Sequence, residues 1–196
     1  MFSGKNRLNS ASWLTLSRMF LLPVAVLPVA LGWRCGWLVC AGVASVAGLT
    51  DILDGYVARR KRETTRMGTN LDLLSDKVFV VGMLVFLAAW GLVHAWVPVL
   101  VLGREIGVSA LRVFRFRSRT PAPSPLGKAK TAASIIAIVW VLLWKDIQTG
   151  GVLAAVPGTG LTALLALAPW AMLLAVLLTL ISGADYVVRY ARVEGS

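Results

Sequence analysis

Four aspartates within one short stretch of the sequence are spaced so that they can share a site. Asp51 and Asp54 are three residues apart, and Asp72 and Asp76 are four apart. Residues at these spacings lie on one face of a helix, so each pair would form a stripe. Gathered carboxylates repel one another unless some are protonated or cations neutralise them. The stretch therefore predicts a cluster that holds either protons or cations.

The residue types around the aspartates favour a divalent cation. Carboxylate oxygens with no histidine or cysteine nearby favour Mg²⁺, Mn²⁺ or Ca²⁺ over zinc. Two such ions can clamp a phosphate group and stabilise the leaving oxygen of an in-line displacement. Gly55, Ala58 and Gly68 are small enough to leave space for a bulky phosphorylated ligand. Arg59, next to Ala58, is a candidate to hold a ligand phosphate.

The elements that carry these residues are expected to be membrane-spanning helices. Of the 196 residues, 58% are hydrophobic and only 15% are charged, which lies outside the range of ordinary soluble domains. Six apolar runs approach the roughly 20 residues that a bilayer requires. They cover residues 11–31, 36–59, 70–92, 95–114, 128–144 and 169–188. We expect an all-α integral membrane protein with six transmembrane helices in one domain, residues 1–196.

The positive charges predict how these helices are oriented. The net charge is +11, and the basic residues fall between apolar runs rather than on a soluble domain, which favours anionic membrane lipids and no nucleic acid as partners. Nearly all connections on one side are basic, whereas the other side holds only Arg34 and Lys145. By the positive-inside rule both termini are cytoplasmic. Six tryptophans near the opposite ends predict an interfacial belt: Trp33, Trp37, Trp90, Trp96, Trp140 and Trp144.

Several other residues receive structural predictions. Cys35 and Cys40 lack metal or disulfide spacing and are expected to be small core residues. Asp146 is expected to be a solvated loop charge, and Asp185 to pair with a basic residue on the cytoplasmic side. The proline-rich segment 119–127 favours an extended connector. Gly103 and Gly107 form a GxxxG motif, which indicates either a dimer contact or packing within one subunit.

The aspartates alone leave several functions open, because intramembrane acids also form proton relays, structural salt bridges or the cation sites of transporters. The full pattern is more specific: residues 51–76 read D-x2-D-G-x2-A-R-x8-G-x3-D-x3-D without a gap. At roughly one chance in twenty per fixed position, an accidental match is negligible. The pattern resembles the signature of the CDP-alcohol phosphatidyltransferase family.

This resemblance implies roles for the residues of the pattern. It implies six membrane helices, commonly a homodimer, and Mg²⁺ or Mn²⁺ chemistry, with two ions, on a CDP-linked lipid. By resemblance Asp76 is a metal neighbour and the catalytic base on the acceptor hydroxyl. The implied metal ligands are Asp51, Asp54, Asp72 and Asp76, and the implied CDP-diacylglycerol-binding residues are Gly55, Ala58, Arg59, Gly68 and Thr15.

Three further segments resemble bacterial phosphatidylglycerophosphate synthases and bear on the acceptor. They are residues 9–23, the R-E-x-x-x-S-A-L-R segment at 104–112 and the G-K-x-K-T segment at 127–131. In the first, Ser10 and Ala11 stand where those synthases have Ile-Pro. Arg104 and Glu105 are not expected to face lipid unpaired, because a buried charge is costly. The acceptor phosphate is expected to bind Arg18, Arg104, Arg112, Lys128, Lys130 and Thr131.

The resemblance covers roughly residues 9–144 and implies a reaction. A phosphatidyl group passes from CDP-diacylglycerol to glycerol 3-phosphate, giving phosphatidylglycerol phosphate and CMP, at the cytoplasmic face of the inner membrane. Serine, inositol phosphate or phosphatidylglycerol as acceptor are alternatives within the family. A neutral acceptor would not need the extra anion site. A divalent-cation transporter is the distant alternative, although such carriers typically show paired repeats, which this sequence lacks.

Overall fold

The computed structural model describes residues 10–61, 66–115, 125–156 and 158–194. Within those ranges, the side chains of residues 10–19, 51–77, 111–115, 125–128, 159 and 189–194 lie outside the description. The described residues form helices and turns, with no strand. The all-α prediction is therefore confirmed for this part of the chain.

Six long helices occupy the described residues, and two short ones precede the last of them. The long helices are α1 (Ser10–Ala30), α2 (Gly36–Lys61), α3 (Arg66–Ala89), α4 (Trp96–Arg115), α5 (Pro125–Gln148) and α7 (Ala168–Glu194). The short ones are the 3-10 helix η1 (Leu153–Ala155) and α6 (Thr159–Leu165), which the hydropathy pattern did not predict. Each of the six predicted spans corresponds to one long helix. The fifth was predicted too short, because α5 begins at Pro125, inside the segment expected to be an extended connector. A proline suits the first turn of a helix, where its missing N–H is not needed.

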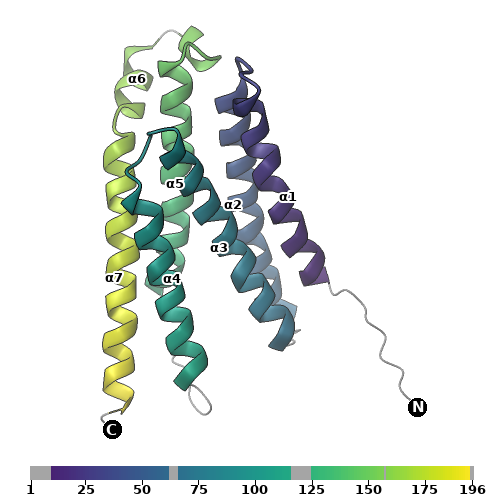
Figure 1. Ribbon diagram of the computed structural model, residues 1–196, viewed down its shortest axis with the longest axis vertical. Coiled ribbons are helices and arrows are strands. Elements are labelled where there is room, and N and C mark those ends of the chain that lie inside the picture. The colour runs from purple at the N-terminus through teal and green to yellow at the C-terminus, as the bar shows by residue number, and fades with distance from the viewer. Residues whose placement is uncertain (1–9, 62–65, 116–124, 157, 195–196) are drawn as a thin grey trace, which may run out of the picture.

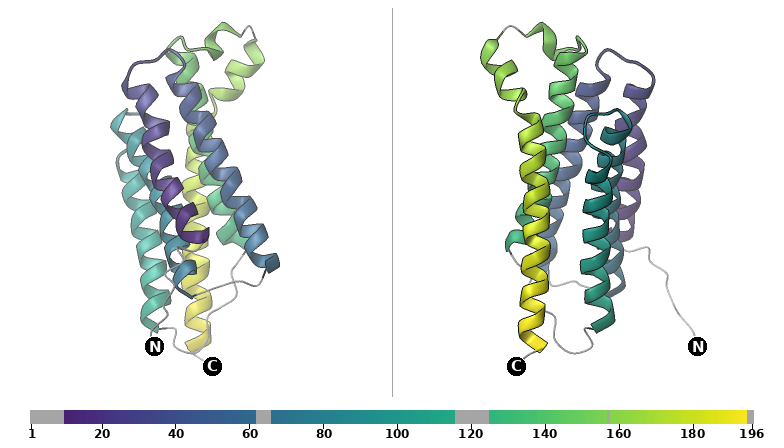
Figure 2. Two further views of the ribbon diagram at one scale, coloured as in Figure 1. Left: turned by 90° about the vertical axis from the view of Figure 1, so that its right-hand side faces the viewer. Right: turned by 60° about the vertical axis from the view of Figure 1, so that its left-hand side comes forward.

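The long helices run up and down in one bundle (Figure 1). Helix α5 packs between α2 and α7, α1 packs on α2 and α3, and α4 packs on α3 and α7. Figure 2 shows η1 and α6 at one end of the bundle and the end of α7 at the other. The end of α4 and the start of α5 lie at the same end as the end of α7 (Figures 1 and 2).

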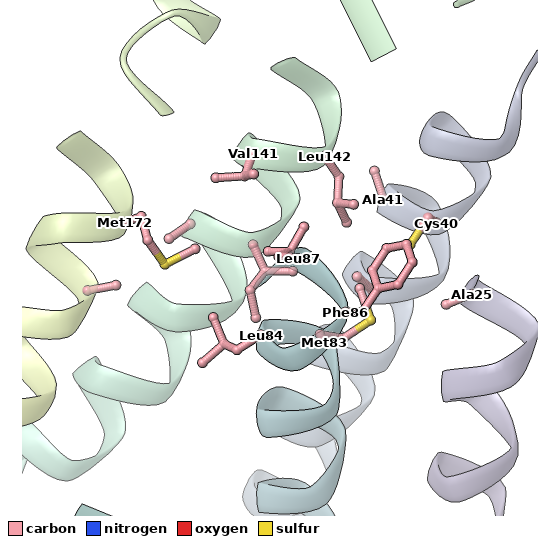
Figure 3. Close-up of a cluster of buried hydrophobic side chains, with 14 of the residues drawn as sticks. Ala25, Cys40, Ala41, Met83, Leu84, Phe86, Leu87, Val141, Leu142 and Met172 are labelled. Carbon is pink, nitrogen blue, oxygen red and sulfur yellow. The ribbon is translucent and has the colours of Figure 1, made fainter. Parts of the chain in front are cut away.

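The core lies where α1, α2, α3, α5 and α7 meet (Figure 3). Met83, Leu84 and Leu87 of α3 are almost fully buried. In Figure 3 Leu87 points towards Leu142 of α5, and Met83 points towards the side of Cys40 of α2. The prediction that Cys40 is a core residue is therefore confirmed, whereas Cys35 is only half-buried. Two glycines allow close helix packing: a Cβ on Gly48 would lie 2.6 Å from Ile135 of α5, and a Cβ on Gly82 would lie 2.6 Å from Leu22 of α1.

Helices α1, α3 and α5 end in the same way. Each is followed by a glycine with positive φ: Gly32 (69°), Gly91 (68°) and Gly150 (69°). After α1, for example, Gly32 donates to the Val29 carbonyl at 3.0 Å and Trp33 donates to the Pro28 carbonyl at 3.0 Å. This is the Schellman arrangement, which satisfies carbonyls that the helix leaves without an internal partner. It stabilises three chain reversals at one end of the bundle.

The third of these reversals corrects the prediction for Asp146. Its side chain is fully buried rather than solvated, and its Oδ2 accepts a hydrogen bond of 2.8 Å from the Leu153 backbone N–H. Oδ1 is also buried and has no hydrogen-bond partner among the described residues. A Cβ on Gly151 would lie within 2.6 Å of the carboxylate, so only glycine fits there without a shift. The reversal folds over Asp146, which sequence spacing alone did not reveal.

The described surface is apolar along much of the bundle. Phe20, Val99 and Trp170 are each about two-thirds exposed, as expected for side chains that face lipid. Two helical stretches, Ala129–Gln148 and Gly160–Val188, are long and apolar enough to cross a membrane, and shorter apolar stretches occur in α1, α2 and α3. Two spans are thus supported by length and composition, whereas the six-span topology stays a prediction.

The predicted tryptophan belt agrees with the burial of only three of its six residues, because Trp140 and Trp144 are half-buried against the core and Trp37 is buried. Trp33, Trp90 and Trp96 are about half exposed, as lipid-interface residues should be. Trp37, in contrast, is buried in the core. Its ring centroid lies 6.0 Å from that of Phe86 and 5.2 Å from that of Trp90, in tilted and edge-on arrangements. These contacts join the beginning of α2 to the end of α3, so Trp37 packs helices together rather than anchoring them in lipid.

Candidate active site

The aspartate pattern lies on two consecutive helices. Asp51 and Asp54 are in the second half of α2, and Asp72 and Asp76 are in the first half of α3. The backbone is therefore helical at all four positions, as the spacing argument requires. Four residues, 62–65, join the two helices, and so short a connection spans at most about 18 Å. The side chains of the four aspartates lie outside the description, so their predicted roles as metal ligands and base stay predictions.

Other predicted site residues also have a described backbone only. The remaining members of the pattern, Gly55, Ala58 and Arg59, belong to α2, and Gly68 belongs to α3. The other predicted residues of this kind are Thr15 and Arg18 in α1, Arg112 in α4 and Lys128 in α5. Their side chains are outside the part of the chain that the structure describes, and their binding roles stay predictions.

The structure does bring together Arg104 and Lys130, two predicted acceptor-binding residues from different helices. Both side chains form ion pairs with the carboxylate of Glu105. Arg104 Nη1 lies 2.6 Å from Glu105 Oε1, and Lys130 Nζ is paired with the same oxygen. All three side chains are only 11–12% exposed. The expectation that Arg104 and Glu105 do not face lipid unpaired is thus confirmed. Glu105 joins α4 to the first turns of α5.

Arg104 has a second anchor on α7 that the sequence did not predict. Its Nη2 donates a hydrogen bond of 3.0 Å to Ser182 Oγ, although the two residues are 78 positions apart. Ser182 is 3% exposed. Next to it, Gly183 faces the stem of the arginine: a Cβ there would lie 3.1 Å from Arg104 Cγ and 3.2 Å from Nε. Nε is buried and has no hydrogen-bond partner among the described residues.

Thr131 follows Lys130 at the start of α5 and is half-buried. One turn further along α5, Ser134 Oγ donates a hydrogen bond of 2.9 Å to the Lys130 carbonyl. The described part of the site is therefore a junction of α4, α5 and α7, which we call the Arg104 junction: Arg104, Glu105, Lys130, Ser182 and Gly183. Two cations and one carboxylate make its charged part, and such charges inside a membrane protein commonly mark ligand sites.

Comparison with known proteins decides the family. The sequence model of the family described as CDP-alcohol phosphatidyltransferase matches residues 8–181, which is most of the chain. The chain belongs to the CDP-alcohol phosphatidyltransferase family. The resemblance drawn from the aspartate pattern is therefore confirmed. The match includes every predicted site residue and ends one residue before Ser182.

Several relatives within the family share one name, CDP-diacylglycerol–glycerol-3-phosphate 3-phosphatidyltransferase. The relative from Sodalis glossinidius (strain morsitans) is 39% identical over 158 residues, which cover 76% of this chain and 85% of the relative. That from Yersinia enterocolitica is 38% identical over 146 residues, covering 71% of this chain and 79% of the relative. That from Pectobacterium atrosepticum is 38% identical over 144 residues, covering 70% and 78%.

Proposed function

We propose that this chain transfers the phosphatidyl group of CDP-diacylglycerol to glycerol 3-phosphate, giving phosphatidylglycerol phosphate and CMP. The observation that carries the proposal is the complete eight-position aspartate pattern in a chain that the family model matches over residues 8–181. The shared name of the relatives supports glycerol 3-phosphate as the acceptor.

The four aspartates fit a divalent metal by the chemistry of their donor atoms. All are carboxylates, and they fall on two helices with a four-residue connection. Hard oxygen donors of this kind suit Mg²⁺ or Mn²⁺. Asp51, Asp54, Asp72 and Asp76 would hold two ions. When bound, the ions supply charge neutralisation at the phosphates of the nucleotide lipid.

Asp76 is the proposed base. Its carboxylate takes the proton from the attacking hydroxyl of glycerol 3-phosphate, which raises the nucleophilicity of that oxygen. The oxygen forms a bond to the phosphorus that carries diacylglycerol, and the bond from this phosphorus to CMP breaks. The proposed contacts of CDP-diacylglycerol are Thr15, Gly55, Ala58, Arg59 and Gly68.

The acceptor phosphate is proposed to bind basic residues from three helices. Arg104 and Lys130 lie in one junction, and this proximity supports a shared anion site. Arg18, Arg112, Lys128 and Thr131 complete the proposed set. Positive charges and a hydroxyl are suitable partners for a phosphate, whereas serine as acceptor would not require them.

The proposed location is the inner membrane, with six spans, both termini in the cytoplasm and the site at the cytoplasmic face. Charge asymmetry supports this orientation, because the basic connections fall on one side. CDP-diacylglycerol would enter from the lipid, and glycerol 3-phosphate and CMP would exchange with water past a basic rim.

A homodimer is the proposed assembly. Gly103 and Gly107 on α4 are exposed, and no atom of the described residues lies within 4 Å of a Cβ placed on either. The described helices therefore do not use the GxxxG motif for packing within one subunit. A small exposed surface on a membrane helix supports contact with another helix.

The lipid product and the Asp76→Asn variant together test this proposal. Purified protein in detergent with CDP-diacylglycerol, glycerol 3-phosphate and Mg²⁺ should form phosphatidylglycerol phosphate, identified by mass spectrometry. The variant keeps the size of the side chain but removes the base, so we expect product formation to fall by at least about 100-fold. Undiminished product formation by the variant would exclude Asp76 as the base, and a different lipid product would exclude the reaction.

A further inference from the structure

The Arg104 junction contains two residues that the family match does not include, Ser182 and Gly183 of α7. Both are buried. Ser182 accepts the hydrogen bond from Arg104 Nη2, and Gly183 leaves the space that the arginine stem occupies. These are two independent contacts, one polar and one steric, between α7 and the same side chain of α4.

The guanidinium of Arg104 is thereby held at both ends. Nη2 is fixed by Ser182 on α7, and Nη1 is fixed by Glu105 on its own helix. Because an arginine side chain has several rotatable bonds, holding it in one orientation has an entropic cost that an unconstrained surface arginine does not bear. The fixed orientation also determines where the Glu105 carboxylate lies, since the two groups share a charge-assisted hydrogen bond.

Lys130 depends on this arrangement in turn. Its ammonium is paired with the Glu105 oxygen that Arg104 also contacts. A displacement of Arg104 would therefore shift Glu105 and, through it, the ammonium of Lys130. The chain of contacts runs from α7 through α4 to α5 and joins residues 182, 104, 105 and 130.

A purely structural role explains this chain of contacts poorly. Partly buried ion pairs are often no more stabilising than apolar side chains of similar volume, because desolvation offsets their attraction. An apolar contact between α4 and α7 would hold the two helices together as well. The charged contacts also hold the Arg104 and Lys130 side chains in defined positions. Such positions matter where an anion must bind with a fixed geometry.

We propose that Ser182 and Gly183 of α7 are positioning residues for the acceptor-phosphate site: they orient Arg104, and Glu105 transmits that orientation to Lys130. This inference rests on the proposed function, because it assigns α7 a part in binding the phosphate of glycerol 3-phosphate. Helix α7 then helps to determine which acceptor binds, although Ser182 and Gly183 lie far from residues 51–76 in the sequence.

Steady-state kinetics of three variants with matched controls test the proposal. Ser182→Ala removes the hydroxyl, Gly183→Ala presses a methyl group against Arg104, and Glu105→Gln removes the charge that joins the two cations. Ser45→Ala is the control for Ser182, because the Ser45 hydroxyl donates only within its own helix, to Ala41. Gly42→Ala is the control for Gly183, because Gly42 of α2 is exposed and a Cβ there has open space.

We expect the three variants to raise the KM for glycerol 3-phosphate by about ten-fold, since displacements near 1 Å can have effects of this size or larger. The inhibition constant of inorganic phosphate, used as a competitor, should rise by a similar factor. The KM for CDP-diacylglycerol should change less than about two-fold, and both controls should match the unchanged protein. Ser182→Ala is the gentlest change, so it tests the proposal even if Gly183→Ala does not fold.

Two results would overturn the proposal, and they differ from failure of the proposed function. If the variants lose thermal stability or kcat while both the KM for glycerol 3-phosphate and the phosphate inhibition constant stay unchanged, the junction is structural only. If the KM values of both substrates rise together, α7 has no specific link to the acceptor. If the unchanged protein releases no CMP with glycerol 3-phosphate, the proposed function is wrong and this inference falls with it.

Discussion

Replacing Gly151 by alanine should destabilise the protein, because the new methyl group would collide with a buried carboxylate. A Cβ at this position would lie within 2.6 Å of the Asp146 carboxylate, far closer than an ordinary van der Waals contact. Asp146 is fully buried at the end of α5, so it has no solvent into which it can rotate without breaking its hydrogen bond to the Leu153 N–H. The side chain or the whole reversal must therefore move.

The size of the effect follows from two terms. Forcing an extra methyl group into a packed site typically costs about 1–3 kcal/mol. Loss of a hydrogen bond to a part-buried backbone N–H adds about 1–3 kcal/mol, less where water can replace the carboxylate. Because the two terms are not additive, we expect Gly151→Ala to lower the free energy of unfolding by about 2–4 kcal/mol.

The assay is unfolding in mixed micelles of increasing denaturing detergent, followed by tryptophan fluorescence. Gly160→Ala is the control, because Gly160 lies exposed in α6 and a Cβ there has open space. A double-mutant cycle with Asp146→Ala isolates the collision: without the carboxylate, Gly151→Ala should cost less than about 1 kcal/mol. The KM for glycerol 3-phosphate should stay unchanged, because Asp146 lies about 24 Å along α5 from Lys130.

Two outcomes would refute this reasoning. An effect of Gly151→Ala within about 0.5 kcal/mol of the Gly160→Ala control would show that the reversal does not pack on the carboxylate. An equal cost of Gly151→Ala with and without Asp146 would show that the carboxylate is not what the methyl group meets.

Three further predictions concern the core, a helix contact and the metal. Leu87→Ala should lower the free energy of unfolding by about 2–5 kcal/mol, because Leu87 is fully buried, whereas Leu174→Ala on the exposed face of α7 should cost less than about 1 kcal/mol; detergent unfolding measures both. Gly48→Ala should destabilise by about 1–3 kcal/mol in the same assay, because its methyl group would meet Ile135 of α5, and Gly42→Ala, which has open space, should not; equal effects would argue against close α2–α5 packing. Chelation with EDTA should abolish CMP release, and added Mg²⁺ or Mn²⁺ should restore it; release that persists after chelation would contradict the metal proposal.

Much of the fold was predictable because hydropathy is a local property. The six apolar runs correspond to the six long helices, and most ends agree within a few residues. The short helices η1 and α6 were missed because their contacts are tertiary. The Asp146 carboxylate caps the segment that contains η1, and Trp140 Nε1 of α5 donates a hydrogen bond of 3.2 Å to the Leu164 carbonyl in α6. The hydropathy pattern of residues 149–167 does not predict either contact.

Burial of single residues was the least predictable property. Asp146 follows an apolar run, and its sequence neighbours resemble a loop, so its burial depends on the chain reversal at Gly150. Trp37 has the composition and position of an interfacial anchor, and only its packing against Phe86 and Trp90 identifies it as a core residue.

The candidate site was predictable where residues of unusual type occur in a fixed pattern. The aspartates stand out in an apolar sequence, and their spacing identified the family that the comparisons show. Ser182 and Gly183 were missed because a small pair in an apolar helix is equally typical of lipid contact, helix packing or a ligand site. The polar side chain of Ser182 within α7 is a local signal that could have found them, but its partner lies 78 positions away.

The most direct test of the proposed reaction is CMP release by the purified protein with CDP-diacylglycerol and Mg²⁺, compared for glycerol 3-phosphate, serine and inositol phosphate. We predict release with glycerol 3-phosphate and none above background with the other two. Release with serine or inositol phosphate instead would keep the family and discard the proposed acceptor and its anion site. No release with any acceptor, under lipid conditions in which a relative is active, would contradict the transferase proposal itself.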